Sequence, residues 1–89
     1  MDFSINYKII QMIVDLSYGK INGWEKYNLA EITNLYLNNN KLKELPNWID
    51  KCINLQELDC SYNEITSLPE NLSSSLQRLD CESNEIKSL

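Results

Sequence analysis

The side chains able to do chemistry in this 89-residue chain are carboxylates, tyrosines and three cysteines, because the chain contains no histidine. Without an imidazole there is no histidine general base, no Cys–His dyad and no zinc site with histidine ligands. The odd number of cysteines, at unmatched spacings, is not a disulfide framework. No nucleophile–base pair is visible. The sequence therefore predicts no catalytic residue, no metal site and no cofactor.

The charge balance restricts the partners of the chain. The net charge is −5 and the isoelectric point is near 4.5, which argues against nucleic acid and anionic membranes as partners. No stretch approaches 18 apolar residues, and the start, MDFSINYKIIQMIVD, lacks the basic region of a signal peptide. We expect a reduced, soluble, cytoplasmic protein.

The second half of the chain repeats one phrase three times. It reads ITNLYLNNNKL from Ile32, LQELDCSYNEI from Leu55 and LQRLDCESNEI from Leu76, and each copy fits L-x-x-L-x-L-x-x-N-x-L with some substitutions. The copies follow one another at intervals of 23 and 21 residues. Such a period predicts a solenoid in which each copy contributes a short strand to a parallel sheet.

Counting back from the repeats places residues 11–31 in the same frame, as a degenerate first repeat in which Gly19 replaces the repeated asparagine. Residues 1–10 are expected to cap the open end of the solenoid; their apolar residues fit a helix or a strand, with the helix slightly favoured. The predicted organisation is a cap, 1–10, and a repeat domain, 11–89, made of repeats 11–31, 32–54 and 55–75 and the partial repeat 76–89.

The returning halves of the repeats, LKELPNWIDKCIN and TSLPENLSSS, both contain Leu-Pro. Proline lacks an N–H and keeps the preceding residue extended, so these segments are predicted to be turns or short 3₁₀ pieces. The expected fold is an α/β solenoid with parallel strands on its concave face and these turns on its convex side.

Inward positions explain most of the apolar residues. The repeated asparagines Asn40, Asn63 and Asn84 are expected to bond backbone groups where each turn begins. Cys60 and Cys81 occupy the same inward position in neighbouring rungs, about 5 Å apart. We interpret them as small core thiols, with a disulfide as the alternative. The predicted apolar stack consists of Leu35, Leu37, Leu42, Leu45, Leu55, Leu58, Ile65, Leu68, Leu72, Leu76, Leu79 and Ile86.

Outward positions on the strands form the candidate binding surface. Five acids against one base give this concave face a formal charge of −4, and three tyrosines add contact area. Either the charge is merely solvated, or the face binds a partner. Ser17, Asn34 and Ser61 are expected on the same face. The predicted partner-binding residues are Asp15, Tyr18, Tyr36, Asn38, Glu57, Asp59, Tyr62, Arg78, Asp80 and Glu82.

The stretch LQELDCSYNEITSLPENLSSSLQRLDCESNEI resembles the short leucine-rich repeats of bacterial effector proteins. Its L-D-C units and its Asn, Ile, Lys and Tyr bias are also similar to repeat proteins of giant viruses that infect amoebae. The repeat at 32–54 is two residues longer than the short bacterial unit. The resemblance implies a protein-binding platform without catalysis, located in a host cytoplasm if the source is a virus or a bacterial effector.

Two functions from different classes follow. The first is a non-catalytic module that binds a basic or mixed-charge protein on its concave face. The second is structural: the chain self-associates as a homodimer through its last rung, which includes Leu79, Ile86 and Leu89 and has no covering neighbour in the sequence. A third alternative is that the chain is a truncated part of a longer repeat array.

Overall fold

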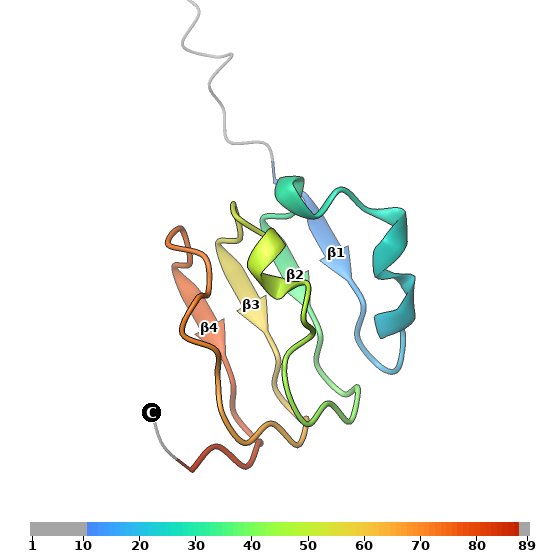
Figure 1. The fold of residues 1–89 in the computed structure, drawn as a ribbon. Helices are drawn as coiled ribbons and strands as arrows, with labels where there is room; N and C mark the ends of the chain where they lie inside the picture. Colours follow the sequence, from blue (N-terminus) through green and yellow to red (C-terminus); the bar gives the residue numbers. More distant parts are fainter. Residues whose placement is uncertain (1–10, 88–89) are drawn as a thin grey trace, which may run out of the picture.

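The computed structural model describes residues 11–87, which form a four-stranded parallel sheet (Figure 1). The strands run in the order β1 (Ile13–Asp15), β2 (Asn34–Tyr36), β3 (Glu57–Asp59) and β4 (Arg78–Asp80). Three short 3₁₀ helices lie between them: η2 (Ile21–Lys26), η3 (Leu29–Glu31) and η4 (Ile49–Lys51). The predicted solenoid of parallel strands with turns and short 3₁₀ pieces is confirmed. The predicted cap, 1–10, and Leu89 lie outside the described residues.

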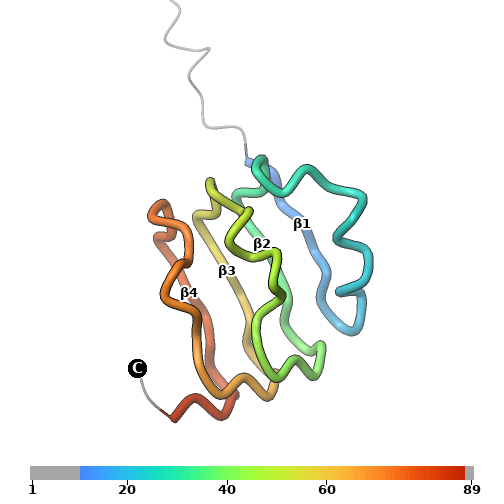
Figure 2. Tube along the Cα trace, in the orientation of Figure 1, coloured from blue at the N-terminus to red at the C-terminus, as the bar shows by residue number. Residues whose placement is uncertain are grey.

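The strand register follows the repeat spacing. Val14 pairs with Leu35, Leu35 with Leu58 and Leu58 with Leu79, so the central residue of every strand lies in one row across the sheet. After each of β1, β2 and β3 the chain turns and returns on the other side of the sheet to the start of the next strand (Figure 2). Residues 11–31 thus contribute a strand in the same register as the later repeats, whereas the exact repeat boundaries stay a prediction.

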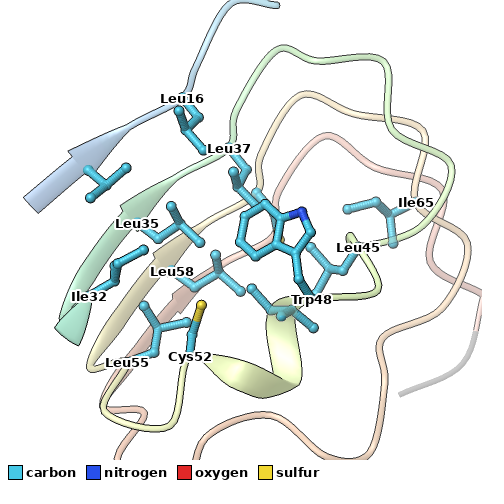
Figure 3. Packing of buried hydrophobic residues seen from close by; sticks show 13 residues of the cluster. Leu16, Ile32, Leu35, Leu37, Leu45, Trp48, Cys52, Leu55, Leu58 and Ile65 are labelled. Carbon is cyan, nitrogen blue, oxygen red and sulfur yellow. The ribbon is translucent and has the colours of Figure 1, made fainter. Parts of the chain in front are cut away.

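The core fills the space between the sheet and the return segments (Figure 3). Leu35, Leu37, Leu55 and Leu58 are at most 1 % exposed. Each such side chain contributes roughly 1.5–3 kcal/mol before conformational entropy is counted. The return segments pack together as well.

An aromatic pair that the repeat pattern does not predict joins two of these return segments. Trp24 of η2 stacks on Trp48, which precedes η4, with ring centroids 5.3 Å apart and an interplanar angle of 22°. The pair extends the core on the return side of the first two coils.

Asn40, Asn63 and Asn84 form an asparagine ladder, whose hydrogen bonds stabilise the turns that follow the strands. Asn63 donates from Nδ2 to the carbonyl oxygens of Leu37, Cys60 and Ser61 at 2.9–3.1 Å. Its Oδ1 accepts the backbone N–H groups of Asn40 and Leu42 at 2.9 and 3.0 Å. Asn40 and Asn84 bond carbonyl oxygens in their own and the preceding rung in the same way. The predicted structural role of the repeated asparagines is confirmed.

The predicted apolar stack lies on the core side of the sheet, but the burial of its members falls off toward β4. Leu79 is 36 % exposed, whereas Leu58 at the same strand position is 1 % exposed. The physical reason is that no strand within residues 11–87 covers the outer side of β4. Other members of the predicted stack are also only partly buried: Leu42, Leu68, Leu72, Leu76 and Ile86.

Candidate functional site

The outer sheet face is the side of the sheet that faces away from the core. It carries two rows of side chains, because residues on either side of each buried central residue point away from it. The register places them as Ile13, Asn34, Glu57 and Arg78 in one row and Asp15, Tyr36, Asp59 and Asp80 in the other.

The remaining predicted residues lie just beyond the strand ends, where backbone hydrogen bonds between neighbouring rungs continue. The N–H of Tyr18 donates to the carbonyl oxygen of Asn38 at 3.0 Å, and the N–H of Tyr62 donates to that of Glu82 at 3.1 Å. Tyr18 is 72 % exposed and Tyr62 is 56 % exposed. The structure therefore brings all ten predicted residues together along one side of the molecule, and their role in binding stays a prediction.

The residue just before each repeated asparagine, or before Gly19 in the first repeat, has a left-handed backbone that the repeat pattern did not predict. Tyr18, Asn39, Tyr62 and Ser83 occupy this position in the four rungs and have φ of +53°, +61°, +53° and +56°. Residues other than glycine rarely adopt this backbone conformation, because it brings Cβ too close to the backbone. The repeated turn therefore fixes where the two exposed tyrosine rings emerge. Asn39 was the one sequence signal for it, because asparagine tolerates the left-handed region.

Aspartates at the strand ends hold the turns as well as charging the face. Oδ1 of Asp15 accepts the N–H of Ser17 at 2.9 Å and also its hydroxyl, and Asp59 accepts the N–H and hydroxyl of Ser61 at 3.0 and 2.6 Å. Asp80 accepts the N–H of Glu82 at 3.2 Å. The recurring Asp-x-Ser spacing is the sequence signal for these turns.

Three residues that the sequence analysis placed on the exposed face are buried instead. Ser17 and Ser61 are 5 % and 4 % exposed, because their hydroxyls turn back to the preceding aspartates. Asn34 is 5 % exposed and accepts the Thr33 hydroxyl at 2.7 Å. These side chains are unavailable to a partner, which leaves carboxylates, tyrosines and Arg78 as its main contacts.

The hydrogen bonds from Ser17 lower the pKa of Asp15 below its ordinary value of 3.8. A depressed folded-state pKa contributes stability above the unfolded pKa and loses it as the pH falls through the folded value. Ser17→Ala removes the largest cause, so we expect the Asp15 carboxyl to titrate at a higher pH, as measured by NMR. Ser67→Ala, at an exposed position, is the control. An unchanged Asp15 titration in Ser17→Ala contradicts the assignment.

The cysteines lie in or beside the core, as predicted. Cys52 and Cys60 are 0 % exposed, Cys81 is half-buried, and all three are free thiols. Burial raises the pKa of Cys52 to about 11 and that of Cys60 to about 12, with the charges of Cys81, Asp59 and Asp80 adding to the latter. Both thiols are therefore protonated at neutral pH and poor nucleophiles. Their redox state in solution stays a prediction.

A hollow of about 160 Å³ lies on the outer sheet face and is lined by Tyr36, Glu57, Leu58, Asp59, Arg78 and Asp80. A larger one, about 270 Å³, lies between the two Leu-Pro turns on the return side, away from the tyrosines and the strand-end aspartates. Among residues 11–87 no three cysteine or carboxylate side chains converge as a metal site would require. No helix in that part of the chain is long and apolar enough to cross a membrane.

Comparison with known families agrees with this architecture. A family described as leucine-rich repeats in two copies matches residues 30–74 and again residues 53–89, which together make up more than half of the chain. Comparison with curated proteins and with solved structures finds no match. Members of the matched family generally act as protein-interaction scaffolds and are typically not enzymes. The chain belongs to the leucine-rich repeat family.

Proposed function

We propose that the chain is a non-catalytic interaction module that binds a basic segment of a partner protein on its outer sheet face, the concave face of the solenoid. The proposal rests chiefly on the distribution of charge. Five acids and one base lie on this face, whereas the rest of residues 11–87 contains seven acids and six bases. The excess negative charge is therefore concentrated where the sheet is open to a partner.

The side chains on the face suit lysine and arginine. Carboxylates attract a cation and steer its approach, and a tyrosine ring holds a cation over its face. The hollow beside Tyr36, Glu57 and Asp59 has room for one side chain. The exposed rings of Tyr18 and Tyr62, beyond the C-terminal ends of β1 and β3, supply apolar contact area. We place this interaction in the cytoplasm, because three cysteines at unmatched spacings are not the disulfide framework of a secreted protein.

The test must remove negative charge from the outer sheet face without breaking the hydrogen bonds that hold the strand-end turns. A lysine at position 59 would break the hydrogen bonds to Ser61, whereas asparagine keeps the Oδ1 acceptor. The test variant is therefore Glu57→Gln with Asp59→Asn. The control is Glu25→Gln with Glu70→Gln, which changes the net charge equally at two exposed positions in the return segments.

We expect the test variant to bind a partner captured from lysate about tenfold or more weakly than wild type, mainly through slower association at low salt. The control variant should bind as wild type does. Affinity is measured by surface plasmon resonance at two salt concentrations. Equal affinities of the test and control variants at both salt concentrations would sink the proposal, since charge on the face would then be irrelevant.

Self-association is a second candidate function, favoured by the 36 % exposure of Leu79 at the outer edge of β4. A sheet edge with exposed apolar side chains recruits other strands. The two functions are compatible, because the outer sheet face stays open when the edge is occupied.

A further inference from the structure

The outer edge of β4 offers backbone groups in a defined pattern. On its inner side, the N–H of Arg78 donates to the carbonyl oxygen of Gln56 at 3.0 Å, and the carbonyl oxygen of Asp80 accepts from Cys60 at 2.9 Å. Alternate residues of a strand direct their backbone groups to opposite sides. Leu79 therefore presents both its N–H and its carbonyl oxygen at the outer edge, and Cys81 its N–H.

We propose that β4 pairs antiparallel with β4 of a second copy of this chain, with the two-fold axis passing between the two Leu79 residues. This inference rests on self-association, the second candidate function. In this arrangement the two Leu79 residues exchange both backbone hydrogen bonds, as residues of a hydrogen-bonded antiparallel pair do. The N–H of each Cys81 then reaches the carbonyl oxygen of Gln77 in the other copy. The sheet becomes continuous across the two molecules.

Charge complementarity favours the antiparallel pairing of β4 with β4 over the stacking of β4 on β1 of another copy. About the Leu79 axis, Arg78 of one copy stands directly opposite Asp80 of the other, so two opposite-charge pairs form on the outer sheet face. The alternative of stacking β4 on β1 of another copy in parallel register would set Asp80 beside Asp15, and the two carboxylates would repel each other. Such a head-to-tail contact would also fail to close, whereas the two-fold pairing closes as a dimer.

The same pairing covers the apolar side of the last rung. Leu79 is 36 % exposed, and Cys81 and Ile86 are partly exposed beside a hollow of about 240 Å³. Residues on the core side of one β4 would meet those of the other, removing this apolar surface from water. Backbone, charge and apolar contacts thus point to one occupant, a second copy.

Charge substitutions at positions 78 and 80 test the pairing. Arg78→Asp alone places two aspartates opposite each other on both sides of the axis, and we expect the dimer dissociation constant, measured by analytical ultracentrifugation, to rise at least about tenfold. Arg78→Asp with Asp80→Asn removes this repulsion, keeps the Oδ1 acceptor for the N–H of Glu82, and should recover much of that loss. Lys51→Asp, in η4, makes the same change in net charge away from the edge and should dimerise as wild type does.

Amide hydrogen exchange gives an independent readout. The amides of Leu79 and Cys81 should exchange more slowly as the wild-type concentration rises, whereas that of Arg78, already bonded to Gln56, should not change. A wild type that is monomeric at all concentrations overturns self-association itself. If the wild type dimerises but the double variant does not recover the dimer, or if the wild-type Leu79 amide is unprotected, the antiparallel pairing is overturned and self-association stands. Neither result bears on the Glu57 and Asp59 test of partner binding.

Discussion

Replacing Asn63 with alanine is expected to lower the free energy of unfolding by about 3 kcal/mol or more, a large share of the total stability of a domain this small. The side chain is 8 % exposed and makes five hydrogen bonds to backbone groups of two rungs. Alanine would leave the N–H groups of Asn40 and Leu42 without a partner. The three carbonyl oxygens would each lose one donor and keep another, from Asn40, Asn84 or the N–H of Asn39. Buried groups left unpaired in this way cost more than the hydrogen bonds had contributed.

Asn40 provides the matched comparison, because its ladder is incomplete. Its Nδ2 bonds the carbonyl oxygens of Leu16, Leu37 and Asn38, but its buried Oδ1 has no partner among the described residues. Where Asn63 bonds two N–H groups of the preceding coil, the coil before Asn40 turns at Gly19 and enters η2. Asn40→Ala should therefore cost clearly less, about 1–2 kcal/mol.

The difference between the two losses is measured by urea unfolding of both variants, monitored by circular dichroism.

Asn63→Asp is a useful third variant, since it keeps the acceptor and removes the donor. At neutral pH its carboxylate would face three carbonyl oxygens. We expect it to be at least as destabilised as Asn63→Ala. Equal losses for Asn40→Ala and Asn63→Ala would mean that the two N–H groups accepted by Oδ1 of Asn63 contribute nothing to stability.

The repeat spacing was enough to predict the sheet. Leu35, Leu58 and Leu79 recur at the intervals that bring one strand above the next, and the asparagines recur with them, so a local pattern determines long-range contacts. Each repeat packs mainly against its neighbours, so the same spacing gives the same strand pairing throughout. For that reason even the degenerate first repeat, with Val14 in place of leucine, was found in the correct register.

Burial on the face could not be predicted in the same way. Strand alternation says which side a side chain is on, but not whether a nearby group draws it inward. Ser17 and Ser61 are buried because they donate to aspartates two residues earlier, and the left-handed backbone at Tyr18 and Tyr62 depends on the turn and not on the residue type. The Trp24–Trp48 stack joins irregular return segments, where spacing carries no information.

Replacing Leu58 with alanine is expected to cost about 3 kcal/mol, within the range found for leucines in well-packed cores. Its side chain is 1 % exposed and lies between the rungs of β2 and β4, so the cavity cannot be filled by solvent or by simple collapse. Leu79 occupies the equivalent place in the last rung but is 36 % exposed. Leu79→Ala should cost about 1 kcal/mol or less in the isolated monomer.

The ratio of these two losses reports whether the outer edge of β4 is open. It is measured by chemical unfolding at low protein concentration, where each chain unfolds alone. A loss for Leu79→Ala equal to that for Leu58→Ala would show that something covers the last rung, contrary to its exposure in the structure. If copies pair through β4, the cost of Leu79→Ala should instead grow with protein concentration while that of Leu58→Ala stays constant, because only Leu79 lies at the contact and association adds its free energy to the folded state alone.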